Sequence, residues 1–121
     1  MLIKKLKDCK NIPGGDNTVI KEVLHPKNDP IVLSYSIAHA SLNPGKKSLK
    51  HKMKSTEVYY ILKGQGIMHI DDESQKVTNG FVVFIPPNSI QYIENIGKGN
   101  LDFLAFCSPP WKFEDEIDFK S

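Results

Sequence analysis

The chain has 121 residues, of which 40% are apolar and 25% are charged. This length and composition are typical of one globular domain and leave no room for a separate catalytic domain. Sixteen basic residues against fourteen acidic ones give a net charge of +2. So small a charge does not indicate binding to nucleic acid or to a membrane surface, and neither is expected as a partner.

The spacing of the cysteines and the lack of long apolar segments indicate where in the cell the protein is found. Cys9 and Cys107 lie far apart in the sequence and match no metal-binding or redox spacing. The lysines near the N-terminus are not followed by an apolar run, so no signal peptide is predicted. No stretch approaches the roughly 18 apolar residues of a membrane span. We therefore predict a cytoplasmic protein with reduced thiols.

Strand signals recur at short, regular intervals along the chain. Apolar and β-branched runs are separated by turns rich in glycine and proline. The predicted strands cover residues 18–24, 31–40, 57–62, 67–71, 75–78, 81–85, 89–94 and 101–107. A short helix is predicted over residues 110–117, which begin with a proline and carry acidic side chains. Many short strands with such turns favour an all-β sandwich or barrel.

Two segments of the chain are organised around glycines and span about fifty residues together. Seven residues carry the pattern: Gly45, His51, Glu57, Gly64, Gly80, Pro86 and Asn95. Their spacing resembles the two signature motifs of the cupin family. The resemblance implies a jelly-roll barrel, or double-stranded β-helix, in a single domain over residues 1–121. The barrel itself is expected over about residues 31–108, followed by a short C-terminal tail or helix.

Three residues depart from the motifs: Met53, Asn88 and Gln91. Where cupins carry three histidines and a glutamate as metal ligands, the resemblance gives His51, Met53, Glu57 and Gln91 here. Side chains alternate along a strand, so His51 and Met53 share one face, as do Glu57 and Tyr59. The predicted ligand cavity is therefore lined by His51, Met53, Glu57, Tyr59 and Gln91.

The altered set weakens the expected metal site. His51, Glu57 and Gln91 can still offer a nitrogen and two oxygens to Mn²⁺, Fe²⁺, Ni²⁺ or Zn²⁺, but a thioether is a poor ligand for these ions. In the alternative interpretation Met53 fills the core and the three polar residues hydrogen-bond one another without metal. Glu57 is then the candidate catalytic base, because burial would raise its pKa.

Charge is unevenly distributed near His51. The lysines there keep strand edges soluble and unpaired, or they form a positive rim that attracts anionic ligands. The lysines concerned are Lys46, Lys47, Lys50, Lys52 and Lys54. His39 and His69 lie in apolar strand context and are interpreted as packing residues.

The C-terminal region resembles the tail of small single-domain microbial cupins. The resemblance implies that Trp111 and the prolines before it close the barrel in this chain. We interpret Trp111 as an aromatic latch that fills a hydrophobic gap. The apolar segments 31–33 and 101–106 exceed what one small barrel covers, so a homodimer is predicted.

Two functions remain open. The first is a binding protein that holds a small polar or anionic molecule in the barrel, with a weakened or absent divalent-metal site. The second is a metal-dependent enzyme of the dioxygenase, decarboxylase or sugar isomerase type. An intact glycine and proline scaffold with an altered ligand set favours the first, because fold and function are separable.

Overall fold

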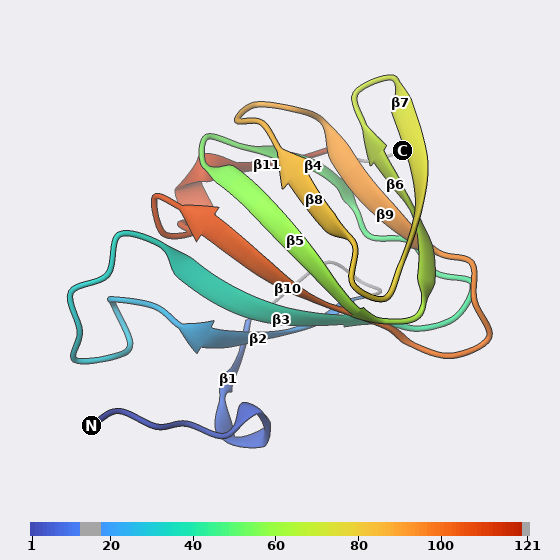
Figure 1. The fold of residues 1–121 in the computed structure, drawn as a ribbon. Helices are drawn as coiled ribbons and strands as arrows, with labels where there is room; N and C mark the ends of the chain where they lie inside the picture. The colour runs from blue at the N-terminus through green and yellow to red at the C-terminus, as the bar shows by residue number, and fades with distance from the viewer. Residues whose placement is uncertain (13–17, 120–121) are drawn as a thin grey trace.

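The structure is a computed structural model that describes residues 1–12 and 18–119. Within these residues, two antiparallel sheets face one another (Figure 1). In spatial order, the six-stranded sheet contains β1 (Lys10–Ile12), β2 (Thr18–Leu24), β3 (Ser36–Leu42), β10 (Leu101–Ser108), β5 (Thr56–Lys63) and β8 (Val82–Ile85). The five-stranded sheet contains β11 (Glu116–Phe119), β4 (Lys50–Met53), β9 (Gln91–Asn95), β6 (Gln65–Ile70) and β7 (Glu73–Thr78). The predicted all-β jelly roll is confirmed.

The core fills one end of the space between the sheets. Strand alternation turns Leu42, Ile61 and Leu101 inward, where their side chains are fully buried. The register pairs Leu101 with Leu42 at this end and Cys107 with Ser36 at the other end of the same two strands. The apolar cluster ends near Phe103, and the opposite end of the barrel is left for a cavity.

Two tight turns restrict which residue can stand at two positions of the glycine pattern. Gly64 joins β5 to β6 with φ of +106°, and an added Cβ would lie 2.7 Å from the Asn100 carbonyl oxygen. Only glycine tolerates both constraints. Asn88, which departs from the motif glycine, has φ of +64°. Asparagine is among the few residues that adopt this left-handed conformation readily, so the substitution preserves the turn.

The strand expected over residues 31–40 begins later, at Ser36. Its partners decide this: β10 pairs with β3 only from Ser36 onward, and β2 pairs no further than Leu24 with Ile37. Without a neighbouring strand, the backbone of residues 31–35 is bent and irregular, although residues 31–33 are apolar.

The helix expected over residues 110–117 is wrong. A single 3-10 turn, η2 (Phe113–Asp115), leads into β11, which pairs antiparallel with β4. The backbone groups on the outer edge of β4 need partners, and β11 supplies them. Neither the pattern of β4, which is rich in lysine, nor that of β11 signals a strand by apolar alternation. The helical segments of the described residues are too short and too polar to cross a membrane.

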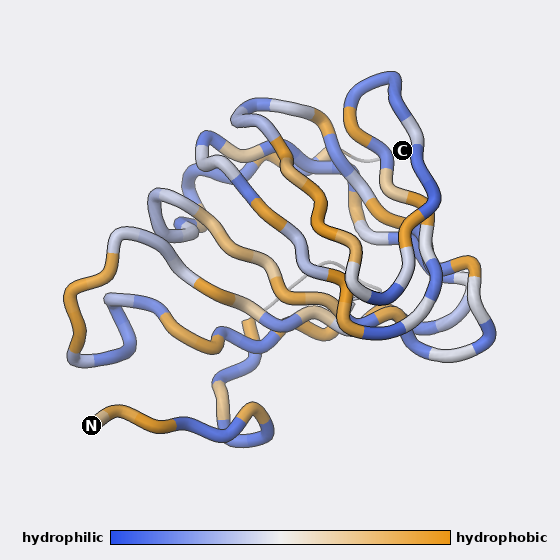
Figure 2. Tube along the Cα trace, in the orientation of Figure 1, coloured by the Kyte–Doolittle hydropathy of each residue, from blue (hydrophilic) through white to orange (hydrophobic). Residues whose placement is uncertain are grey.

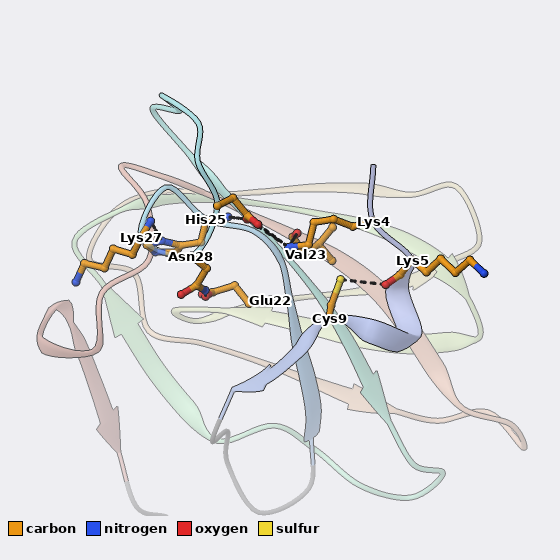
Figure 3. A network of polar contacts seen from close by, with 9 residues as sticks. Lys4, Lys5, Cys9, Glu22, Val23, His25, Lys27 and Asn28 are labelled. Atoms are coloured by element: carbon orange, nitrogen blue, oxygen red, sulfur yellow. Dashed lines mark hydrogen bonds and ion pairs between the residues drawn. The ribbon is translucent and has the colours of Figure 1, made fainter. Parts of the chain in front are cut away.

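The N-terminal segment is fastened to the edge of the six-stranded sheet (Figure 3). After η1 (Leu6–Asp8), the chain forms β1 beside β2. The Lys4 ammonium donates to the Val23 carbonyl oxygen at 2.6 Å and to the Asp29 carboxylate at 3.0 Å. The Cys9 thiol donates to the Lys5 carbonyl oxygen at 3.3 Å. Cys9 and Cys107 are both buried free thiols.

The outer side of the six-stranded sheet carries contiguous apolar side chains. They form two cross-strand rows over β3, β10, β5 and β8, and Figure 2 shows the hydrophobic stretch along β8. We call this surface the outer apolar face; it consists of Ile37, Val58, Tyr60, Val82, Leu104, Phe106 and Phe84. Val82 and Phe84 are the most exposed, at 64% and 61%.

A candidate ligand cavity between the sheets

A cavity of about 380 Å³ lies between the sheets, at the end of the barrel that the core leaves open. Its walls come from β1, β2, β3, β5 and β10 of one sheet and from β4 and β11 of the other. Four of the five predicted cavity residues line it: His51, Met53, Glu57 and Tyr59. The fifth, Gln91, lies behind them and is 1% exposed.

Strand pairing brings the predicted residues together from distant parts of the sequence. His51 on β4 pairs with Gln91 on β9, and Glu57 on β5 pairs with Cys107 on β10. Because both strand pairs turn these side chains toward the space between the sheets, the two motifs meet inside the barrel. His51 and Gln91 therefore both point inward, as the motif spacing implies.

Glu57 is the buried acid of the cavity, at 4% exposure. Its Oε1 accepts a hydrogen bond from Gln91 Nε2 at 2.6 Å, and its Oε2 accepts one from the Cys107 thiol at 3.5 Å. Burial raises the pKa of Glu57, while His51 and the bond from Gln91 oppose the rise. Burial also raises the pKa of Cys107 far above its ordinary value, so this residue is a neutral donor.

Gln91 uses both ends of its amide within the protein. A carboxylate can only accept, so the amide nitrogen faces Glu57, and the amide oxygen accepts the Tyr59 hydroxyl at 3.0 Å. Tyr59 is buried, and burial raises its pKa well above the ordinary value. The result is a buried chain of hydrogen bonds, Tyr59 to Gln91 to Glu57.

His51 presents a free ring nitrogen to the cavity. Its Nδ1 lies 3.1 Å from the Leu49 carbonyl oxygen, which can only accept, so Nδ1 carries the hydrogen. In the neutral ring, Nε2 is then an acceptor. Nε2 lies 3.9 Å from Glu57 Oε1, beyond hydrogen-bonding distance.

Few metal-binding groups converge in the cavity. Met53 lies in the wall with 3% exposure and contributes a thioether. Among residues 1–12 and 18–119, no group of three or more His, Cys, Asp or Glu side chains is placed to hold a metal ion. Of the four positions that the motif implies, His51 and Glu57 offer the available nitrogen and oxygen.

The sequence reasoning missed two acids at the cavity wall, Glu116 and Asp118 on β11. Burial and a hydrogen bond with Asp118 raise the pKa of Glu116 to about 7, against the lowering effects of Trp111 and His51. The signal was the alternation of two acids in the C-terminal segment. The helix expected over residues 110–117 includes Glu116 and ends before Asp118, so it does not place the two side chains on one face.

Trp111 lines the cavity and is held on three sides. Its backbone N–H donates to Ser36 Oγ at 2.9 Å, and its indole N–H donates to Glu116 Oε1 at 3.0 Å. The Trp111 carbonyl oxygen lies 2.8 Å from His25 Nε2. Because the Lys27 N–H donates to His25 Nδ1, His25 Nε2 carries the hydrogen and donates to Trp111. The buried His25 is thus a second residue that the sequence analysis overlooked.

The lysines around His51 do not form a rim inside the barrel. Lys50 and Lys47 lie over the ring of Tyr92, at 5.3 and 5.8 Å from its centroid, and Lys52 lies over Phe119 at 6.0 Å. None of the five lysines is among the described residues that line the cavity. This arrangement favours the interpretation of solubilising strand residues.

The two strand histidines lie away from the cavity. His69 stacks on Tyr92, with ring centroids 4.1 Å apart, and its Nε2 lies 2.6 Å from Glu94 Oε1. His39 lies opposite Leu104 on the outer side of the six-stranded sheet. Neither lines the cavity among the described residues.

Comparisons with known proteins agree with the fold. A family model described as a cupin domain matches residues 38–107. An uncharacterized protein of Methanocaldococcus jannaschii is 42% identical over 101 residues, which cover 83% of this chain and 80% of that protein. An oxalate-binding protein of Thermotoga maritima is 34% identical over 102 residues, which cover 78% of this chain and 79% of that protein.

A solved structure is also similar. A protein from Thermotoga maritima, described as a predicted oxalate decarboxylase, superposes with a TM-score of 0.76 at 24% identity. The match covers 89% of this chain and 99% of that one. At this identity the likeness shows the shared fold.

Proposed function

Because this chain belongs to the cupin family, we propose that it is a binding protein whose barrel cavity holds a small polar molecule. In this proposal a divalent metal is bound weakly or not at all, and the ligand is not turned over. The oxalate-binding relative supports a small-molecule ligand.

One observation carries the proposal: Gln91 is committed to Glu57 and Tyr59 through both ends of its amide. Gln91 does not line the cavity, so its amide would have to turn to reach a metal there, and the turn would leave the Tyr59 hydroxyl buried without an acceptor. Leaving such a group unsatisfied costs about 1–3 kcal/mol. With Met53 contributing only a thioether, the set does not fit a tightly held Mn²⁺, Fe²⁺, Ni²⁺ or Zn²⁺ ion.

The alternative function is a metal-dependent enzyme. It is favoured by the inward-facing His51 Nε2 and Glu57, which lie 3.9 Å apart and are both acceptors. In that case Glu57 would be the catalytic base, and the Gln91 amide would have to turn.

Metal analysis separates the two functions. Protein purified without chelator and without a nickel column should contain well under one equivalent of divalent metal. Titration calorimetry with Mn²⁺ and Zn²⁺ should give weak binding that is lost in His51→Ala. One tightly held equivalent in the wild type, with an activity that chelation removes, would establish the enzyme instead.

We also propose that two copies pair through the outer apolar face. Its exposed Val82 and Phe84 lie on β8, an edge strand, so a second copy related by a two-fold axis can cover them. A domain of this size gains stability from such burial. This face keeps Leu104 and Phe106 of the expected surface, whereas Leu101 and Phe103 are buried in the core and residues 31–33 lie outside the strands. The cytoplasmic location stays a prediction from cysteine usage, which cell fractionation tests.

A further inference from the structure

The polar groups at the cavity floor are arranged to receive hydrogen-bond donors. His51 Nε2 and Glu57 Oε1 both accept, and they face the same space 3.9 Å apart. Two acceptors at this distance cannot bond each other. Two N–H groups of one nitrogen atom can reach both of them with hydrogen bonds of about 2.9 Å. The second lone pair of Glu57 Oε1 remains available for this, because Gln91 occupies only one.

The charge of the cavity wall is negative. Four carboxyl groups line it, from Glu22, Glu57, Glu116 and Asp118. Among the described lining residues, His51 is the only one with a basic side chain. A carboxylate ligand would enter against several like charges, which costs affinity, whereas a cation would be attracted.

The remaining wall suits an organic group. Aromatic rings of Tyr59, Phe103 and Trp111 line the cavity, and the Tyr59 and Phe103 ring centroids are 4.5 Å apart. Aromatic faces attract organic cations through their ring electrons and cover apolar carbon. A volume of about 380 Å³ far exceeds the needs of a bare metal ion, and it falls in the range of small-molecule pockets.

From these observations we infer that the cavity binds an organic primary or secondary ammonium, whose N–H groups lie between His51 Nε2 and Glu57 Oε1. The carbon part of the ligand lies against Tyr59, Phe103 and Trp111. This inference rests on the proposed binding function and names the chemical class of the ligand.

Four probes of similar shape test it: benzylamine, trimethylbenzylammonium, benzyl alcohol and benzoate. Trp111 is the single tryptophan of the chain and lines the cavity, so its fluorescence reports binding alongside calorimetry. At pH 8, benzylamine should bind at least about tenfold tighter than benzoate, which corresponds to about 1.4 kcal/mol. It should also bind tighter than trimethylbenzylammonium, which has the charge but no N–H donor.

A variant in the cavity and a matched control on the surface test the position of the site. Glu57→Gln should weaken benzylamine binding about tenfold or more and leave benzyl alcohol binding within about threefold. Asp72→Asn removes the same charge from an exposed turn between β6 and β7 and should change neither. Circular dichroism checks that each variant is folded, and Glu116→Gln, in the cavity wall, should also weaken benzylamine binding and gives a second readout if Glu57→Gln does not fold.

The outcomes separate this inference from the proposed function. Benzyl alcohol or benzoate binding as well as benzylamine would overturn the ammonium inference and leave a small-molecule cavity in place. Equal binding of the two cations would overturn the role of His51 and Glu57 as acceptors. If none of the four probes binds and one metal equivalent binds tightly, both the inference and the proposed function are wrong.

Discussion

Replacing Gln91 with leucine tests the buried hydrogen-bond chain on which the proposed function depends. The substitution keeps a similar volume at a position that is 1% exposed, and it removes both the donor to Glu57 and the acceptor for Tyr59. The lost bond to a carboxylate is worth about 1.5–3 kcal/mol, and a stranded buried hydroxyl costs about 1–3 kcal/mol. Since leucine returns some apolar burial, we expect a net loss of roughly 2–4 kcal/mol at pH 8.

The loss should depend on pH, and its sign follows from Glu57. Gln91 stabilises the ionised carboxylate, and burial raises the pKa of that group in the folded protein. As the pH falls toward the raised pKa of Glu57, the carboxylate takes up a proton, the charge-assisted bond weakens, and the loss of Gln91 destabilises the fold less. The destabilisation should therefore be larger at pH 8 than at pH 5.

Urea unfolding at pH 8 and pH 5 measures both quantities. Tyr59→Phe is the matched control: it removes one neutral hydrogen bond, so it should cost about 1 kcal/mol at both pH values. A Gln91→Leu loss below about 1 kcal/mol at pH 8, or a loss that does not change with pH, would refute the described network.

The remaining predictions concern metal binding, pH and assembly. Met53→His with Gln91→His adds two nitrogen donors, so Zn²⁺ should raise the melting temperature of the double variant far more than that of the wild type; an equally large wild-type shift would contradict this. The pKa of Glu116 rises from 4.5 to about 7 on folding, so its stabilising contribution is present below pH 4.5 and is lost as the pH rises through 7. Glu116→Gln should therefore raise the melting temperature more at pH 8 than at pH 5, and the opposite trend would disprove the assignment. Sedimentation of the wild type should give the mass of a dimer at micromolar concentration, and a monomeric wild type would contradict the dimer proposal. Phe84→Glu should shift the mass to that of one chain, whereas the control Val32→Glu, in the loop before β3, should leave the dimer intact.

Much of the candidate site could be predicted because strand alternation and motif spacing are local properties. His51, Met53, Glu57 and Tyr59 line the cavity because each lies at an inward position of its strand. The two departures, Met53 and Gln91, were also visible in the sequence. Their consequence was not visible, because the engagement of the Gln91 amide depends on Glu57 and Tyr59 of another strand.

The residues that could not be predicted owe their roles to pairing across the barrel. Glu116 and Asp118 face the cavity because β11 pairs with the outer edge of β4, and residues 110–117 by themselves carry helix signals. The sequence by itself determined the all-β class, the turn positions and the inward set near His51, since turns and alternation need only neighbouring residues. The tertiary structure decided the negative cavity wall and the outward lysines, since these depend on which strands become neighbours.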